Sequence, residues 1–141
     1  MRIEHGIEIG APVARVWGLT LDVESWPRFV PTMDSVDRLD SGPLAVGSQA
    51  RVRQPGQPSR VWTVTQLDPE RVFAWSVALM GITMTAIHSL QPVGGTTFNT
   101  LVVEIEGRLA PVVGTLLRRR ILSAITNENE GFKKAAEDLG A

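Results

Sequence analysis

The feature that most constrains this fold is the last stretch of the chain, Leu109 to Leu139, which has the pattern of one long amphipathic helix. Pro111 suits the first turn of a helix, where its missing N–H costs nothing, and Gly140 is a natural stop signal. At 100° per residue one stripe collects the apolar residues Leu117, Ile121, Ala124, Ile125, Phe132, Ala135, Ala136 and Leu139. A helix of about 29 residues spans roughly 43 Å, longer than a small domain is wide. We therefore expect it to lie across the concave face of a curved sheet.

The residues before this helix predict two short helices and seven strands. Arg2 to Ile9 alternates like a half-buried strand. Pro12 then starts a short helix, and Leu21 to Phe29 forms a helical turn or two that Asp22 caps and that stops before Pro27. The remaining strands, separated by Gly and Pro turns, are Val36–Leu39, Gln49–Arg53, Val61–Leu67, Val72–Leu79, Ile82–Leu90 and Thr97–Glu106. The short turns favour antiparallel neighbours, and the order of elements predicts an α+β domain over residues 1–141.

Composition excludes several classes of function. Lys+Arg 14 against Asp+Glu 15 gives a net charge of -1, so no basic excess points to nucleic acid as a partner. There are no cysteines and two histidines, so we expect no disulfide, no metal site and no cofactor. No apolar run is long enough to cross a membrane and no leader precedes the first strand, so we expect a cytoplasmic protein. We expect it to be a monomer or a weak homodimer.

An ordered set of motifs then carries a family resemblance over essentially the whole chain. They are Ala11-Pro12, Val16-Trp17, Asp22, Trp26-Pro27, Gly47, Trp62-Thr63-Val64, Asp68-Pro69, Phe73-Ala74-Trp75, His88 and Gly94-Gly95-Thr96. This set, ending in the long helix, resembles the polyketide cyclase/dehydrase group of the START-like (Bet v 1-like, SRPBCC) superfamily. The resemblance implies a helix-grip fold, in which a curved antiparallel sheet of about seven strands wraps around the C-terminal helix. It also implies a deep hydrophobic pocket for a lipid, polyketide, sterol, quinone or similar small molecule.

We expect a cavity of several hundred Å³, in the usual range of ligand sites, between the long helix and the sheet. It should open near the loops after Trp26 and Met80. Aromatic and methionine side chains suit a pocket that adapts to its contents. The predicted ligand-binding residues are Trp26, Phe29, Met33, Trp62, Val64, Phe73, Trp75, Met84, His88, Phe98, Thr100, Ile121, Ile125 and Glu128.

Two of these residues are candidates for proton chemistry. His88 lies on an apolar strand face, where it serves either as an interior residue or as a pocket group that bonds a ligand or transfers a proton. Glu128 falls in the middle of the apolar helix stripe, so it must be paired, protonated or exposed to a wet cavity. Glu104 raises the same question on the last strand. Either face of that strand can be the buried one by its pattern.

Three functions remain open from the sequence. The first is a carrier, sensor or sequestering protein for a hydrophobic molecule. The second is a polyketide cyclase or dehydratase that uses His88 with a glutamate. The third is a protein-interaction or chaperone-like factor that presents Leu101, Val103 and Ile105 outward. Arg118-Arg119-Arg120 is interpreted as a solvated stretch, or as the source of one arginine at the pocket mouth.

Overall fold

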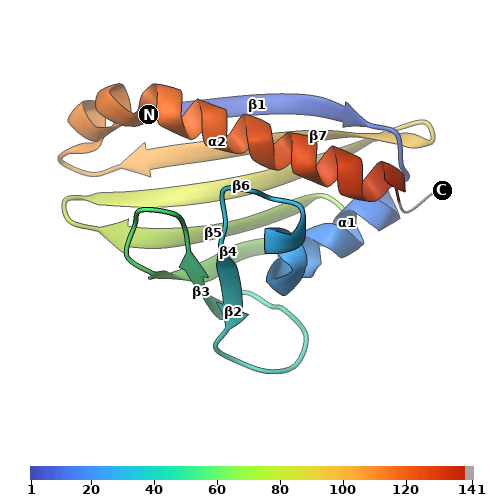
Figure 1. The fold of residues 1–141 in the computed structure, drawn as a ribbon, viewed down its shortest axis with the longest axis horizontal. Helices are drawn as coiled ribbons and strands as arrows, with labels where there is room; N and C mark the ends of the chain where they lie inside the picture. Colours follow the sequence, from blue (N-terminus) through green and yellow to red (C-terminus); the bar gives the residue numbers. More distant parts are fainter. Residues whose placement is uncertain (139–141) are drawn as a thin grey trace.

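The computed structural model describes residues 1–138 as one antiparallel sheet with a long helix across it (Figure 1). The elements are β1 (Arg2–Ile9), α1 (Val13–Leu21), the 3-10 helix η1 (Val23–Arg28), β2 (Ser35–Arg38), β3 (Gln49–Arg53), β4 (Arg60–Asp68), β5 (Val72–Leu79), β6 (Ile82–Val93), β7 (Thr96–Glu106) and α2 (Ala110–Asp138). The strand order is β1-β7-β6-β5-β4-β3-β2. This is the predicted helix-grip fold, an α+β arrangement with two short helices after the first strand.

The strand boundaries differ from the predicted ones by no more than a few residues. β6 continues to Val93 because Pro92 and Val93 still pair with Thr97 and Thr96 across the Gly94-Gly95 turn. The prediction that the second short helix stops before Pro27 is wrong, because η1 includes that proline. Leu139 and Gly140, the predicted end of the last helix, lie outside the described residues.

Asp22 occupies the N-cap position of η1 without the predicted side-chain cap. Its carboxylate instead accepts a hydrogen bond from the Ser25 hydroxyl at 2.6 Å, while the Ser25 backbone N–H donates to the Asp22 carbonyl oxygen. Asp22 therefore starts the turn through its main chain and stiffens it through its side chain.

Helix α2 packs mainly on β1 and β7, at one side of the sheet, and not over its middle. A buried polar contact fixes it there: the Asn99 side chain on β7 donates to the Asn129 side-chain oxygen on α2 at 2.8 Å. The Asn129 amide in turn donates to the His5 carbonyl oxygen on β1 at 3.0 Å. Buried amides are costly unless bonded, so this network specifies how α2 sits on the sheet.

Two apolar clusters occupy the concave side of the sheet. The larger one joins α1, η1 and the end of α2 to β3–β6, and at its centre the Trp26 ring lies 5.8 Å from Phe73 and 5.4 Å from Phe132. The smaller one joins the first half of α2 to β1, β6 and β7. These edge-to-face aromatic pairs add about 0.5–1.5 kcal/mol each beyond the area they bury. The clusters lie at opposite ends of the concave face.

The structure also decides which face of β7 is buried. Leu101, Val103 and Ile105 belong to the smaller cluster, together with Ala110 and Ile125 of α2. The expectation of an outward apolar patch at these three residues is therefore wrong. The strand has apolar residues on both faces, and only the position of α2 shows which face is inside.

Candidate functional site

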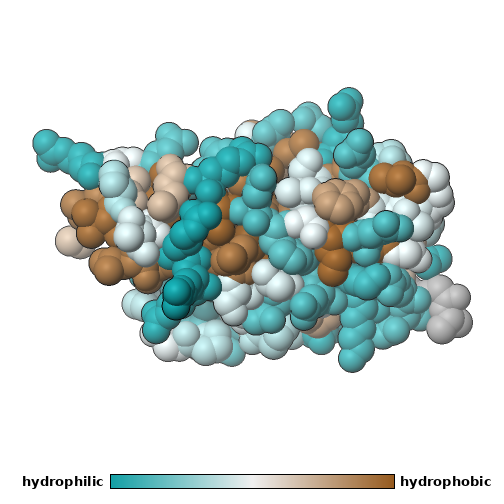
Figure 2. All heavy atoms as spheres, turned by 90° about the horizontal axis from the view of Figure 1, so that it is seen from above, coloured by the Kyte–Doolittle hydropathy of each residue, from teal (hydrophilic) through white to brown (hydrophobic). Residues whose placement is uncertain are grey.

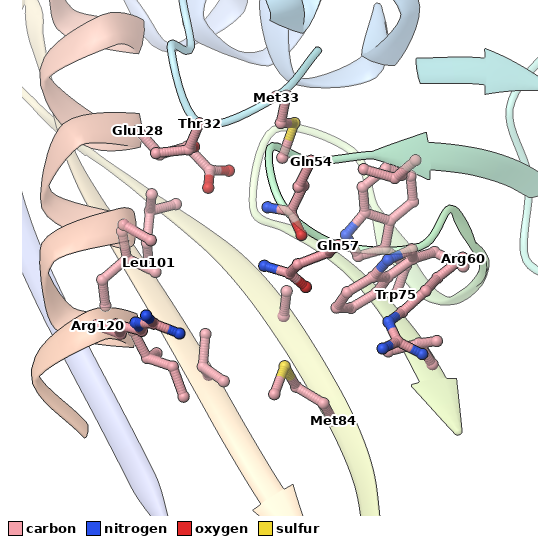
Figure 3. Close-up of a pocket in the computed structure, with 18 of the residues that line it drawn as sticks. Thr32, Met33, Gln54, Gln57, Arg60, Trp75, Met84, Leu101, Arg120 and Glu128 are labelled. Carbon is pink, nitrogen blue, oxygen red and sulfur yellow. The ribbon is translucent and has the colours of Figure 1, made fainter. Parts of the chain in front are cut away.

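A cavity of about 710 Å³ lies between α2 and the middle of the sheet (Figure 3). It exists because α2 packs on β1 and β7 and leaves the concave faces of β4, β5 and β6 partly uncovered. Apolar side chains of both core clusters, including Trp75, Met84 and Leu101, form its walls together with Val77. Its volume falls within the usual range of small-molecule sites.

The segment after η1 and the β3–β4 loop form the outer part of the cavity. Pro31, Pro55, Gln57 and Arg120 line it and are exposed. The sequence also predicts an opening near the loop after Met80. Met80 itself is 93% exposed and does not line the cavity.

Eight of the predicted ligand-binding residues line this cavity. They are Met33, Trp62, Trp75, Met84, His88, Ile121, Ile125 and Glu128. Seven of these positions follow from the periodicity of β4–β6 and α2, which the sequence shows directly, whereas Met33 lies in the segment between η1 and β2.

Four other predicted residues lie behind the cavity wall. Trp26, Phe29, Val64 and Phe73 pack in the larger core cluster and are absent from the lining. Trp26 is fully buried because η1 carries its ring down onto the sheet, and its indole N–H donates to the Leu19 carbonyl oxygen at 3.0 Å. The aromatic residues near the loops thus divide between core and cavity, which residue type alone did not reveal.

The prediction that Phe98 and Thr100 line the cavity is wrong. They alternate along β7 with residues that face α2, so their side chains lie on the other side of the sheet. There the Phe98 ring covers Gly6 of the adjacent strand, at a distance that leaves no room for a Cβ. Glu104 lies on the same outer side, and its carboxylate is 2.9 Å from Nη1 of Arg2.

His88 and Glu128 meet at the inner end of the cavity. Nε2 of His88 lies 3.4 Å from Oε1 of Glu128, and the two side chains are 2% and 12% exposed. Figure 3 shows the Glu128 carboxylate pointing from α2 into the cavity. The carboxylate can accept a hydrogen bond from a ligand hydroxyl, and the imidazole behind it can share a proton with it.

The other ring nitrogen of His88 is enclosed. The imidazole centroid lies 5.0 Å from that of Trp26, 5.6 Å from Phe73 and 5.5 Å from Phe132. Among residues 1–138, Nδ1 has no hydrogen-bond partner. Because Nδ1 is enclosed, Nε2 is the ring nitrogen of His88 that is available to the Glu128 carboxylate and to groups in the cavity.

Four polar residues of the outer cavity were not predicted as site residues. Gln54 and Gln57 belong to the β3–β4 segment, Arg60 starts β4, and Arg120 belongs to α2. Figure 3 shows the two glutamine side chains and the Arg120 guanidinium directed into the cavity from opposite walls. The sequence offered only the alternative of one arginine from 118–120 at the mouth. The loop glutamines carry no periodic signal.

The fold is that of a START-like, helix-grip domain with a partly open cavity between the long helix and the sheet. The family described as polyketide cyclase / dehydrase and lipid transport matches residues 1–137, and this chain belongs to that family. No curated protein sequence matches the chain. No helix within residues 1–138 combines the length and the apolar character required to cross a bilayer.

Several solved structures share this fold. A START superfamily protein from Mycobacterium smegmatis has a TM-score of 0.80 at 17% identity, covering 98% of this chain and 98% of that one. The Zhui aromatase/cyclase from Streptomyces sp. R1128 has a TM-score of 0.78 at 19% identity, covering 97% and 93%. A norcoclaurine synthase point mutant from Thalictrum flavum, in complex with a transition state analogue, has a TM-score of 0.78 at 16% identity, covering 100% and 96%. At these identities the likeness extends to the fold alone.

Proposed function

We propose that this protein binds a small, mainly hydrophobic molecule in the cavity between α2 and the sheet, as a carrier, sensor or sequestering protein. The observation that carries the proposal is the cavity of about 710 Å³, because a folded core of this size otherwise fills its interior at crystal-like density. Its apolar walls suit the body of such a ligand. The few polar groups that converge on it suit an oxygen-bearing substituent.

The polar groups sit at two levels of the cavity. Glu128 and His88 lie at its inner end, while Gln57 and Arg120 line its exposed part. A ligand with a hydrophobic ring system or chain and polar oxygens near both ends satisfies both levels. A purely aliphatic chain would leave the buried Glu128 carboxylate without a ligand partner, at a cost of about 1–3 kcal/mol or more.

Binding of an environment-sensitive apolar dye tests the proposal directly. Trp62 and Trp75 line the cavity, so the dye should bind the folded protein and quench tryptophan emission. Ala124→Phe places a ring in the cavity and should abolish binding with little change in melting temperature. The matched control is Ala14→Phe, at an exposed position of α1, which should bind as wild type does.

Native mass spectrometry of the protein purified from its own host complements the dye. A retained hydrophobic mass, lost in Ala124→Phe, would identify the ligand. If no apolar probe changes the tryptophan emission of the wild-type protein, the binding proposal is wrong.

A second candidate function is a cyclase or dehydratase that acts on a poly-β-carbonyl chain. The approach of His88 Nε2 to Glu128 Oε1 favours it, because a paired imidazole and carboxylate inside an apolar cavity can act as general base and acid. Holding such a chain folded beside the pair would supply the rest of the rate enhancement.

Two substitutions separate the two functions. In an enzyme, His88→Ala and Glu128→Gln should each lower turnover of a poly-β-carbonyl thioester by about 10²- to 10⁴-fold with a small effect on affinity. In a carrier they should weaken binding by about 1 kcal/mol, or up to about 3 where a charged group made the bond. Glu130→Gln, at an exposed position of the same helix, is the control. If both variants lose several degrees of melting temperature and keep wild-type affinity, the two residues serve only the core.

A further inference from the structure

The charged residues between the end of β7 at Glu106 and the middle of α2 are all positive. Residues 107–127 contain four arginines, Arg108, Arg118, Arg119 and Arg120, and no acidic residue, whereas residues 128–138 contain four acids and two lysines. All four arginines are exposed, and within residues 1–138 none of them forms a salt bridge. Helices are stabilised by acids in the first turn and bases in the last, and α2 has neither, while its arginines at 118–120 lie outside both turns. Helix stability therefore does not explain this charge.

The first half of α2 also exposes a stripe of apolar side chains. Leu109, immediately before the helix, is 48% exposed, Val112 57% and Leu116 77%. Their spacing of three and four residues puts them on one face. The opposite face, with Ala110 and Ile125, is buried against the sheet. The chain thus has a second apolar face on α2 that no described residue covers.

The turn between β5 and β6 extends this stripe. Met80 in that turn is 93% exposed, and its neighbour Gly81 lies so close to Leu109 that a Cβ would be 2.8 Å from the leucine Cδ1. The Leu109 backbone N–H also donates to the Gly81 carbonyl oxygen at 3.2 Å. Figure 1 places this turn and the start of α2 at the same end of the molecule, and Figure 2 shows hydrophobic side chains gathered at that end.

Arginines border the apolar stripe on both sides. At about 100° per residue, Arg119 lies about 60° to one side of Leu116 and Arg120 about 40° to the other. An apolar stripe flanked by cationic side chains is the pattern of helices that lie in a membrane interface. We define the docking face as Met80, Leu109, Val112 and Leu116 with Arg108 and Arg119. Arg118 lies about 160° from Leu116, on the far side of the helix, and the Arg120 guanidinium is directed into the cavity.

We propose that this docking face binds the surface of an anionic lipid bilayer, with the apolar side chains in the interface and the guanidinium groups on lipid phosphates. Charge complementarity favours a lipid surface, because the face carries two arginines and no acid and residues 107–127 contain no acidic residue, while the protein as a whole has a net charge of -1. A stable protein interface uses about 20–30 residues a side, many more than this face offers.

Docking in this way would bring the cavity wall to the membrane. Three docking-face residues are each next in sequence to a residue that lines the cavity. These pairs are Met80 and Leu79, Leu116 and Leu117, and Arg119 and Arg120. The inference goes beyond the proposed ligand binding, since the docking face consists largely of residues outside the cavity.

Flotation of the full-length protein with lipid vesicles tests this inference. It should bind vesicles of phosphatidylcholine mixed with phosphatidylglycerol, should bind phosphatidylcholine vesicles weakly or not at all, and should release as salt is raised. Arg108→Gln with Arg119→Gln should lower the partition coefficient by about fivefold for each arginine, the equivalent of about 1 kcal/mol each. Arg51→Gln with Arg53→Gln, at exposed positions of β3, is the matched control and should bind like wild type.

Apolar insertion is tested by Val112→Ser with Leu116→Ser. This double variant should lose at least about tenfold in partition coefficient, because the transfer of two aliphatic side chains from water is removed. Val46→Ser with Val93→Ser, at positions 63% and 53% exposed, is the control. All four variants replace exposed side chains outside the cavity, so dye binding should persist in each.

Three results would overturn the inference. The first is no binding to either kind of vesicle, and the second is equal loss of binding in the docking-face and control variants. The third is a concentration-dependent dimer in light scattering that Val112→Ser with Leu116→Ser dissociates, which would make the face a contact between two copies. If the wild-type protein binds the dye but no vesicles, the docking proposal is wrong and the ligand proposal stands. If the wild-type protein does not bind the dye, the ligand proposal is wrong.

Discussion

Gly131 in α2 and Gly18 in α1 are helical glycines, and alanine should affect them differently. A Cβ at Gly131 would overlap the backbone carbonyl oxygen of Phe29, whereas a Cβ at Gly18 would have no neighbour within 4 Å. Alanine is favoured over glycine in a helix by about 1 kcal/mol at either position. The difference between the two variants therefore isolates the clash.

The size of that clash follows from the atoms involved. The neighbour of Gly131 is main chain, which cannot rotate away as a side chain would, so the segment after η1 or the helix itself has to shift. Forced overpacking of this kind costs about 1–3 kcal/mol. For a chain of 141 residues, 1 kcal/mol corresponds to about 4 °C of melting temperature, so Gly131→Ala should melt about 4–12 °C below Gly18→Ala.

Calorimetry or thermal circular dichroism measures this difference. Gly18→Ala should melt at or slightly above the wild-type temperature. Since Thr32 and Met33 follow the displaced segment and line the cavity, Gly131→Ala should also change dye affinity while Gly18→Ala should not. Equal melting temperatures for the two variants would refute the close approach of Phe29, directly after η1, to α2.

Two further predictions concern how the second half of α2 is held. Asn129→Ala should lower the free energy of unfolding by about 2–4 kcal/mol in denaturant titration, since it leaves buried amide groups unpaired, while the exposed Asn127→Ala should be within about 0.5 kcal/mol of wild type. The Lys133 ammonium and the Gly10 backbone N–H, both bonded to the Glu137 carboxylate, hold the pKa of that group below its usual value of 4.5. The stabilisation is therefore present above the ordinary pKa and is lost as pH falls through the lower folded one, so wild type and Glu137→Gln should converge in melting temperature on acidification.

The sequence by itself determined the elements and the fold class. Strand alternation and turn residues located all seven strands to within a few residues, because a half-buried antiparallel strand must alternate and its turns need Gly or Pro. The 3.6-residue period of the last segment predicted one long helix, and because the residues before it read mainly as strands, a curved sheet was the surface predicted to hold it. The same periods brought Met84, His88, Ile121 and Glu128 to one cavity.

Only the tertiary structure decided which of two equivalent faces is inside. β7 has apolar residues on both sides, so the sequence allowed Phe98 to be predicted in the cavity and Val103 to be predicted on the outer surface. The position of α2, set by Asn99 and Asn129, reverses both assignments. Trp26 and Trp75 are the same residue type, yet Trp26 lies in the core because η1 carries its ring onto the sheet, whereas Trp75 lines the cavity. Periodicity reports that a face is buried, whereas a contact between residues far apart in sequence determines what covers it.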